Sequence, residues 1–92
     1  MTVWETLNLC ALGARWIFRE FVRLYPDGFI LMDDAEMERH FNVCNRTLRA
    51  HLGDLRRHRL LRRGRHGDCY YIPTVVSGKF QEELICNSTL LH

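Results

Sequence analysis

The sequence of 92 residues lacks several features that would assign it at once to a broad class. No apolar run approaches the roughly 20 residues that a membrane-spanning helix needs. The first ten residues, MTVWETLNLC, contain no basic residue and include Glu5, so they do not read as a signal peptide. Internal repeats and low-complexity tracts are missing too. We therefore expect one small globular domain inside a cell.

Paired metal-ligand and catalytic motifs are also missing. The cysteines are far apart and form no Cys-x-x-Cys pair, which favours reduced thiols over disulfides; they are Cys10, Cys44, Cys69 and Cys86. His40 lies four residues before Cys44, and His66 lies three before Cys69, but neither pair supplies the four converging ligands of a zinc site. No Gly-x-x-x-x-Gly-Lys loop is present. The sequence therefore predicts no metal site, no cofactor and no catalytic residue.

Charge is unevenly distributed, although the formal net charge is only +2. Residues 46 to 66 hold eight arginines and one acid, Asp54, which gives +8 − 1 = +7, so the other residues sum to +2 − 7 = −5. Residues 27 to 38 contribute five acids and no base. This asymmetry predicts an anionic partner, with a solvated charged face as the alternative.

Apolar spacing predicts one long helix over residues 3 to 25, with Gly13 as a point that could divide it. The stripe consists of Trp4, Leu7, Ala11, Ala14, Phe18, Phe21 and Tyr25. Pro26 ends the pattern. Because such a helix is longer than a core of this size needs, its first turns, with Trp4, Leu7 and Ala11, form a predicted dimer interface.

Two short elements are predicted next. The apolar run FILM, residues 29 to 32, is typical of a strand. Asp33 followed by Glu36 forms a capping box, in which the Asp33 carboxylate accepts a backbone N–H of the first helical turn. A helix is therefore expected over about residues 34 to 41, with a turn at Asn42 and Val43.

A second helix, a hairpin and a tail complete the chain. Leu48, Leu52 and Leu55 lie at helical spacing, which predicts a helix over about residues 45 to 58. The segments LLRR and CYYIPTVV, joined by a turn at residues 64 to 68, predict a β-hairpin. A last short helix with Ser77 as its cap is expected in the tail.

The segment FNVCNRTLRAHLGDLRRHRLLRRGRHGDCYYI resembles the winged helix-turn-helix DNA-binding domains of small bacterial, archaeal and phage regulators. The resemblance covers about residues 15 to 75. It implies an α+β, mainly α fold with a long N-terminal helix and a small β-hairpin wing. Residues 1–14 would be a possible dimerisation extension, residues 15–76 the winged-helix core, and residues 77–92 a C-terminal tail.

The chain departs from that family's pattern at two positions. Cys44 stands where Ser or Thr usually caps the recognition helix, and Asn45 is an alternative cap. Arg59 or His58 stands where the family usually has glycine in a left-handed conformation. Neither departure prevents the fold.

The resemblance implies that the helix over residues 45 to 58 enters the major groove of double-stranded DNA. Its expected contact residues are Asn45, Arg46, Thr47, Arg49, Ala50, Gly53, Arg56 and Arg57. Arg46 and Arg49 are expected near base edges, and Arg56 and Arg57 near phosphates. The wing is expected to contribute Arg62, Arg63, Arg65 and His66, with Arg65 as the probe of a narrow minor groove.

The sequence thus predicts a non-enzymatic, dimeric transcriptional regulator that binds double-stranded DNA, or a replication or partition accessory factor. It would be cytoplasmic and nucleoid-associated, or lie inside a host cell if a virus encodes it. The rival class is a winged-helix protein-interaction module, for example a viral or mobile-element protein that docks on a host factor. RNA binding is disfavoured because no aromatic stacking motif is present.

Overall fold

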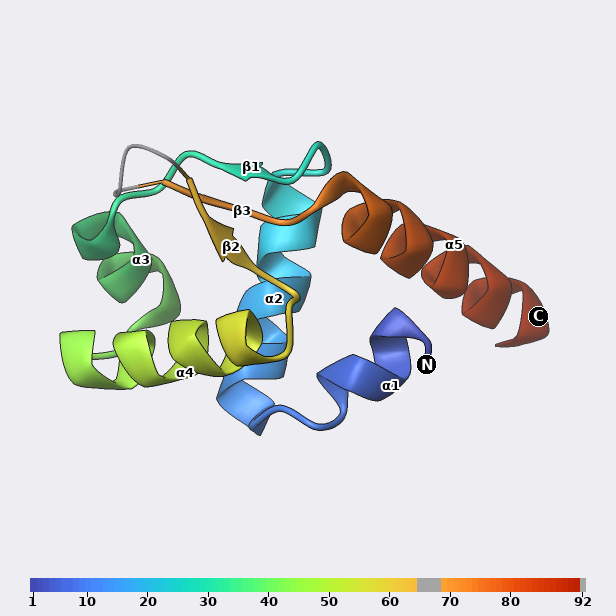
Figure 1. Cartoon of the computed structure of the whole chain (residues 1–92), viewed down its shortest axis with the longest axis horizontal. Coiled ribbons are helices and arrows are strands. Elements are labelled where there is room, and N and C mark those ends of the chain that lie inside the picture. Colours follow the sequence, from blue (N-terminus) through green and yellow to red (C-terminus); the bar gives the residue numbers. More distant parts are fainter. Residues whose placement is uncertain (65–68, 92) are drawn as a thin grey trace.

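The chain folds into helices and one small sheet arranged around a central helix, α2 (Figure 1). The computed structural model describes residues 1–64 and 69–91, with side chains as far as residue 85. The described elements are α1 (Val3–Leu7), α2 (Leu12–Leu24), β1 (Phe29–Ile30), α3 (Asp34–Phe41), α4 (Asn45–Arg57), β2 (Arg62–Arg63), β3 (Tyr70–Tyr71) and α5 (Thr74–Leu91). The molecule is therefore α+β and mainly helical. None of the described helices is long and apolar enough to cross a membrane.

The single long helix predicted at the N-terminus is wrong, because the chain turns between α1 and α2. The Asp54 carboxylate, which belongs to α4, accepts the Ala11 main-chain N–H at 2.9 Å. The Arg15 guanidinium donates to the main-chain carbonyls of Cys10 and Asn8 at 2.9 and 3.0 Å. These tertiary and side-chain hydrogen bonds satisfy backbone groups that a continuous helix would have paired internally.

Gly13 does not mark the break but allows α2 to approach α4 closely. A Cβ atom at Gly13 would lie 2.3 Å from Nε2 of His51. Any larger residue would force the His51 ring away or separate the two helices.

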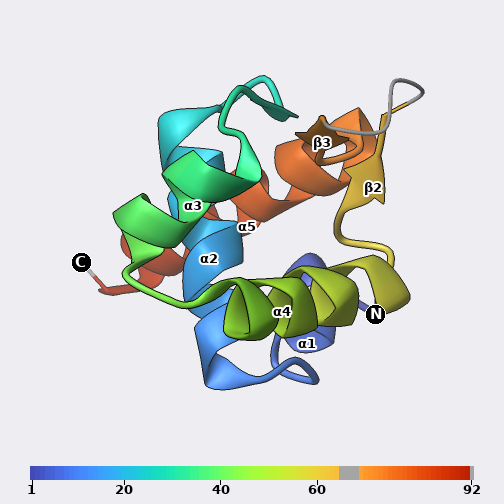
Figure 2. The same ribbon diagram turned by 90° about the vertical axis from the view of Figure 1, so that its left-hand side faces the viewer.

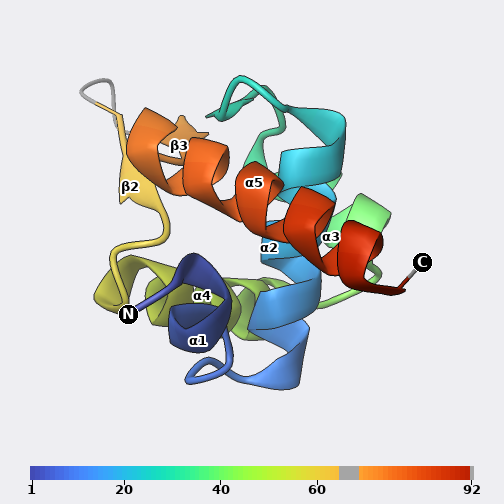
Figure 3. The same ribbon diagram turned by 90° about the vertical axis from the view of Figure 1, so that its right-hand side faces the viewer.

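The two chain ends, predicted as a dimerisation extension and a tail, pack on each other and on the core. The Trp4 ring stacks on Phe80 of α5 with centroids 6.0 Å apart. The Glu83 carboxylate accepts the main-chain N–H groups of Val3 and Trp4 at 3.1 and 2.8 Å. Phe80 is only 1% exposed and belongs to the same core cluster as Leu7. Figure 3 shows α5 crossing α2, and α1 contacts the middle of α5 through Phe80 and Glu83.

The predicted short tail helix is also wrong in its length and its start. α5 begins at Thr74, directly after Pro73. The main-chain N–H groups of Val76 and Ser77 both donate to the Pro73 carbonyl, at 2.9 and 3.0 Å. Ser77 therefore lies inside the helix, where its hydroxyl donates to the Thr74 carbonyl at 3.3 Å. A proline before the first turn suits a helix start because its missing N–H is not needed there.

The α3–turn–α4 segment confirms the predicted elements closely. Asp33 caps α3, and its carboxylate accepts the Glu36 N–H at 2.8 Å. Asn42 adopts a left-handed conformation, with φ of 54°, and the Val43 N–H donates to the Glu38 carbonyl at 3.1 Å. Asparagine tolerates this conformation better than most residues. The cap of α4 is Cys44, so the alternative cap at Asn45 is wrong.

The sheet is antiparallel, with strand order β1-β3-β2. Tyr70 of β3 pairs with Ile30 on one side and Arg63 on the other. Tyr70 is 7% exposed and Ile72 is 2% exposed, so this face of the hairpin packs on the helices. Cys69, on the opposite face, is exposed. Figure 2 shows β2 rising from the C-terminal end of α4, which places the hairpin beside that helix.

Arg59 occupies the left-handed position between α4 and β2. Its φ is 62°, and the Leu60 N–H donates to the Leu55 carbonyl at 3.0 Å, which closes the helix end. Glycine takes this conformation without the steric cost that a Cβ atom incurs. The expected left-handed position is therefore confirmed at Arg59, and excluded at His58, whose φ is −92°.

We predict that Arg59→Gly stabilises the protein by about 0.5–1 kcal/mol, because left-handed strain of about 1–2 kcal/mol exceeds the extra entropy that glycine loses on folding. Urea denaturation measures the change. The control is Arg56→Gly, inside α4, which should destabilise by about 1 kcal/mol. Equal destabilisation by both changes would contradict the strain at Arg59.

Candidate nucleic-acid interface

α4 presents two chemically different faces. Leu48, Leu52 and Leu55 are each no more than 2% exposed and pack into the core. The opposite face exposes Arg46, Thr47, Arg49, Ala50, Arg56 and Arg57. Asn45 and Gly53 are half-buried. A helix whose exposed face carries arginines and small residues can approach a polyanion closely.

A basic groove lies between the C-terminal half of α4 and β2. Its volume is about 510 Å³, and its lining residues are Gly53, Arg56, Arg57, Leu61, Arg62 and Arg63. Leu61 is 1% exposed and forms the floor, whereas the four arginines are exposed. Three of the predicted helix residues, Gly53, Arg56 and Arg57, therefore line one surface with Arg62 and Arg63 of the predicted first wing strand.

The groove arginines have few competing partners in the described chain. Arg57 Nη1 lies 4.0 Å from Oδ1 of Asp54, and the Arg57 side chain is 75% exposed. An exposed pair at that distance contributes little and leaves the guanidinium available to another anion. The Arg63 guanidinium lies 5.5 Å from the centre of the Tyr70 ring. This cation–π contact favours a position of the Arg63 side chain over β3.

Some predicted site residues are not brought to this groove. Arg65 and His66 lie outside the described residues. The Asn45 amide points toward α3, where it donates to the Glu38 carboxylate at 3.5 Å. Arg46 and Arg49 lie on the exposed face of α4 but not among the groove-lining residues.

The predicted dimer residues are divided by the fold. Leu7 is 2% exposed within the core, and Trp4 is partly buried against Phe80. Ala11 is exposed. The apolar stripe that predicted a dimer is thus largely covered within the chain. The dimer stays a prediction, and most of this stripe is not available as its interface.

Cys44 lies at the N-terminus of α4, beside the predicted base-contacting residues. Its sulfur lies 3.3 Å from the Thr47 hydroxyl oxygen. The pKa of the Cys44 thiol is lowered, first by this side-chain hydrogen bond and then by the Thr47 main-chain N–H. The exposed thiol is therefore more acidic than an ordinary cysteine.

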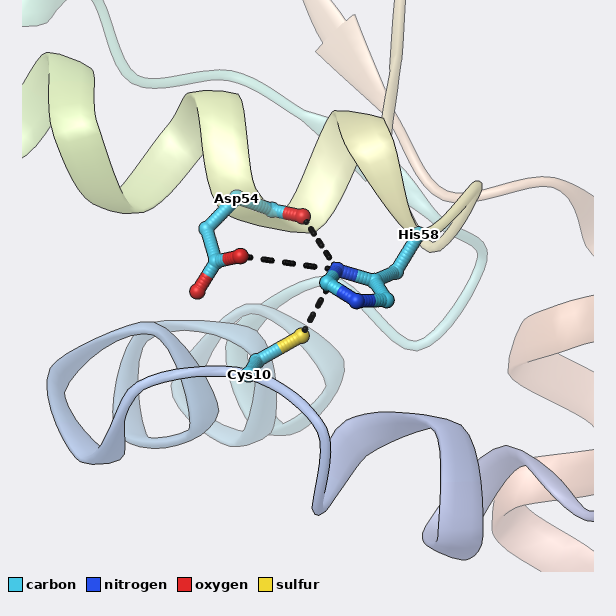
Figure 4. Close-up of side chains that lie close together, drawn as sticks. All are labelled: Cys10, Asp54 and His58. Atoms are coloured by element: carbon cyan, nitrogen blue, oxygen red, sulfur yellow. Dashed lines mark hydrogen bonds and ion pairs between the residues drawn. The ribbon is translucent and has the colours of Figure 1, made fainter.

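A second group of polar and ionisable side chains is brought together by the fold and was not predicted from the sequence. Cys10, Asp54 and His58 converge between the 8–11 turn and α4 (Figure 4). His58 Nδ1 lies 3.5 Å from Cys10 Sγ and 3.4 Å from Oδ1 of Asp54. The four-residue spacing of Asp54 and His58 could have indicated that these two side chains lie close together. Nothing in the sequence indicated that Cys10 joins them.

This cluster is not arranged as a cysteine nucleophile with a base. In such a triad the cysteine and the orienting carboxylate contact different ring nitrogens of the histidine. Here both face the same nitrogen, Nδ1, which also donates to the Asp54 main-chain carbonyl at 2.9 Å. Burial, followed by the negative charge of Asp54, raises the pKa of the Cys10 thiol.

No protein-family model, curated protein or solved structure matches this chain.

We predict that Cys44 reacts with iodoacetamide faster than Cys10 at neutral pH. Its lowered pKa gives a larger thiolate fraction, whereas Cys10 is 3% exposed and has a raised pKa. Peptide mass spectrometry after timed alkylation measures both rates. Thr47→Val should slow Cys44 while leaving Cys10 unchanged; faster labelling of Cys10 in the folded protein would refute the assignment.

Proposed function

We propose that this protein binds double-stranded DNA through α4 and the β2–β3 hairpin, as a winged helix-turn-helix protein. The observation that carries the proposal is the basic groove, which Arg56 and Arg57 of α4 line together with Arg62 and Arg63 of β2 and the buried Leu61. A role as a small transcriptional regulator is compatible with a chain of 92 residues that carries an arginine-lined groove.

The order of elements supports the winged-helix assignment. α2, β1, α3, α4, β2 and β3 follow one another, with a tight left-handed turn at Asn42 between α3 and α4. In a helix-turn-helix the second helix of such a pair enters the major groove with its N-terminal residues near base edges. Arg46 and Arg49 hold those positions on α4, and both are exposed.

The sign and placement of charge support DNA over an acidic protein patch as the ligand. Arginines extend from the first turn of α4 to β2, so they follow a surface longer than one carboxylate cluster. A duplex carries one charge per about 1.7 Å of axis, so it offers phosphates to arginines spread over both α4 and β2. Arginine also binds phosphate and guanine in a bidentate manner.

We predict that duplex binding weakens steeply with salt. About five to eight phosphate contacts imply a loss of about 10³- to 10⁴-fold in affinity between about 50 and about 200 mM salt. Arg56→Ala should reduce the slope of log K against log salt by about 0.9. Fluorescence anisotropy with a labelled random duplex measures both quantities.

The matched control is Lys79→Ala, which removes one exposed positive charge from α5, outside the groove. This variant should keep the wild-type slope. Absence of duplex binding even at low salt would defeat the proposal, and equal slopes for the two variants would place the contact surface elsewhere.

A second prediction uses two helical glycines with similar surroundings. A Cβ atom at Gly53 or at Gly78 would have no described neighbour within 4 Å, apart from its own helix backbone. Gly53→Ala and Gly78→Ala should therefore each stabilise the fold by about 0.5–1 kcal/mol. Only Gly53 lines the groove, so only Gly53→Ala should weaken DNA binding. Thermal unfolding and anisotropy separate the two effects, and an unchanged DNA affinity for Gly53→Ala would exclude close approach there.

A protein-docking module is the second candidate function, because one end of α2 exposes apolar side chains. Leu9, Leu12 and Trp16 are 61%, 75% and 50% exposed. Exposed apolar groups that gather in one region can mark an interaction site. A protein that fails to bind any duplex at low salt would favour this alternative.

A further inference from the structure

Three side chains of metal-ligand type meet at the junction between the 8–11 turn and α4. In the part of the chain that the structure describes, Cys10, Asp54 and His58 form the one group of three or more such residues whose ligand atoms all lie within 4.8 Å of one another. Figure 4 shows the Cys10 sulfur and an Asp54 carboxylate oxygen both directed at Nδ1 of His58. The proposed DNA interface does not use this arrangement.

We propose that Cys10, Asp54 and His58 bind a divalent metal ion of the zinc class. A thiolate, an imidazole nitrogen and a carboxylate oxygen are each ligands that zinc accepts. The thiolate and the imidazole disfavour magnesium and calcium, which prefer all-oxygen sites. The inference stands whether or not the protein binds DNA, because it uses residues that do not line the basic groove.

The distances fit a tetrahedral ion. Zinc lies about 2.3 Å from sulfur and about 2.0–2.2 Å from nitrogen or oxygen, so tetrahedral angles separate sulfur from nitrogen by about 3.6 Å and nitrogen from oxygen by about 3.4 Å. The observed separations are 3.5 Å between Cys10 Sγ and His58 Nδ1, and 3.4 Å between that nitrogen and Oδ1 of Asp54. The third separation, between Cys10 Sγ and an Asp54 carboxylate oxygen, is at most 4.8 Å, so this edge must shorten toward about 3.6 Å when the ion binds.

Backbone contacts hold two of the three ligands in place. The other carboxylate oxygen of Asp54, Oδ2, accepts the Ala11 N–H at 2.9 Å, which leaves Oδ1 turned toward His58. The Cys10 carbonyl accepts the Arg15 guanidinium at 2.9 Å, which fixes the turn that carries the sulfur. Ligands oriented by such outer hydrogen bonds are typical of metal sites.

Metal binding would break the hydrogen bond from His58 Nδ1 to the Asp54 main-chain carbonyl. At 2.9 Å this bond is shorter than the contacts of Nδ1 with Cys10 Sγ and Asp54 Oδ1, so the imidazole ring must turn toward the ion. The thiol proton and the Nδ1 proton pass to solvent when the ion binds. The Asp54 main-chain carbonyl then loses the Nδ1–H donor but keeps the His58 main-chain N–H at 3.2 Å. The contact of Arg57 with Asp54, at 4.0 Å, is long and exposed.

The cluster is closed on one side and open on the other. Cys10 is 3% exposed, whereas the side chains of Asp54 and His58 are 17% and 24% exposed. Water can therefore reach the centre and supply the fourth ligand. The ion would join the N-terminal segment to α4, so binding should stabilise the fold.

The test uses the full chain without a histidine tag, freed of metal by a chelator and titrated with Co²⁺ and Zn²⁺. We expect one equivalent of Co²⁺ to give tetrahedral d–d absorption and a sulfur-to-cobalt charge-transfer band, both lost on adding Zn²⁺. Zn²⁺ at about 100 times its Kd should raise Tm by about 10 °C or more.

Two ligand variants and one matched control locate the ion. Cys10→Ser and His58→Gln should each weaken Zn²⁺ binding by about 100-fold or more, since even outer-shell changes cost 10–100-fold. Circular dichroism checks that each variant folds. If Cys10→Ser does not fold, the Zn²⁺ affinity of His58→Gln, which alters the more exposed ligand, tests the site. The double variant His40→Gln/Cys44→Ser alters a histidine and a cysteine outside the cluster and should bind as wild type does.

Several results would overturn the proposal. They are no binding at a large molar excess of ion, cobalt spectra without the charge-transfer band, binding that survives both ligand changes, and binding lost in the His40/Cys44 control. A protein that binds zinc but not DNA would refute only the proposed function, and the reverse result would refute only the metal site.

Discussion

The Asp54 carboxylate is the constraint on which the arrangement of this molecule depends. It is the one acid in a segment of eight arginines, and its carboxylate accepts a main-chain N–H from the N-terminal part of the chain. Oδ2 accepts the N–H of Ala11 at the start of α2, where a negative charge is also favoured by the helix dipole. Oδ1 faces His58, the C-cap of α4. One side chain thus binds the residue before α2 and connects the start of α2 to α4.

That junction determines where the basic surface lies. α2 approaches α4 closely at Gly13 and His51, and the leucines of α4 are buried on the same side. The arginines are left on the outer face because burying unpaired guanidinium groups would cost far more than exposing them. The left-handed Arg59 then turns the chain so that β2 returns beside α4. Packing of the leucine face of α4 therefore places the contacts with α2 on one side of this helix and the basic groove on its exposed side.

The chain ends complete a core that the central elements could not close alone. Small domains bury a limited fraction of their surface, so each additional covered aromatic ring contributes appreciably. Phe80 of α5 lies against both Trp4 and Phe18, and Glu83 holds the first turn of α1 by two main-chain hydrogen bonds. An apolar stripe that looks like surplus in the sequence is therefore used within the same chain.

The sequence by itself determined the local elements whose signals lie within a few residues. Asp33 and Glu36 identified the start of α3, the leucine spacing identified α4, and the asymmetry of charge identified the exposed basic face. Only the tertiary structure decided the break between α1 and α2, the length and packing of α5, and the meeting of Cys10 with Asp54 and His58. The physical reason is that helix periodicity records which side of a segment is apolar, but not which distant group will cover it. A hydrogen bond across 43 residues, from Ala11 to Asp54, leaves no pattern in the sequence around either residue.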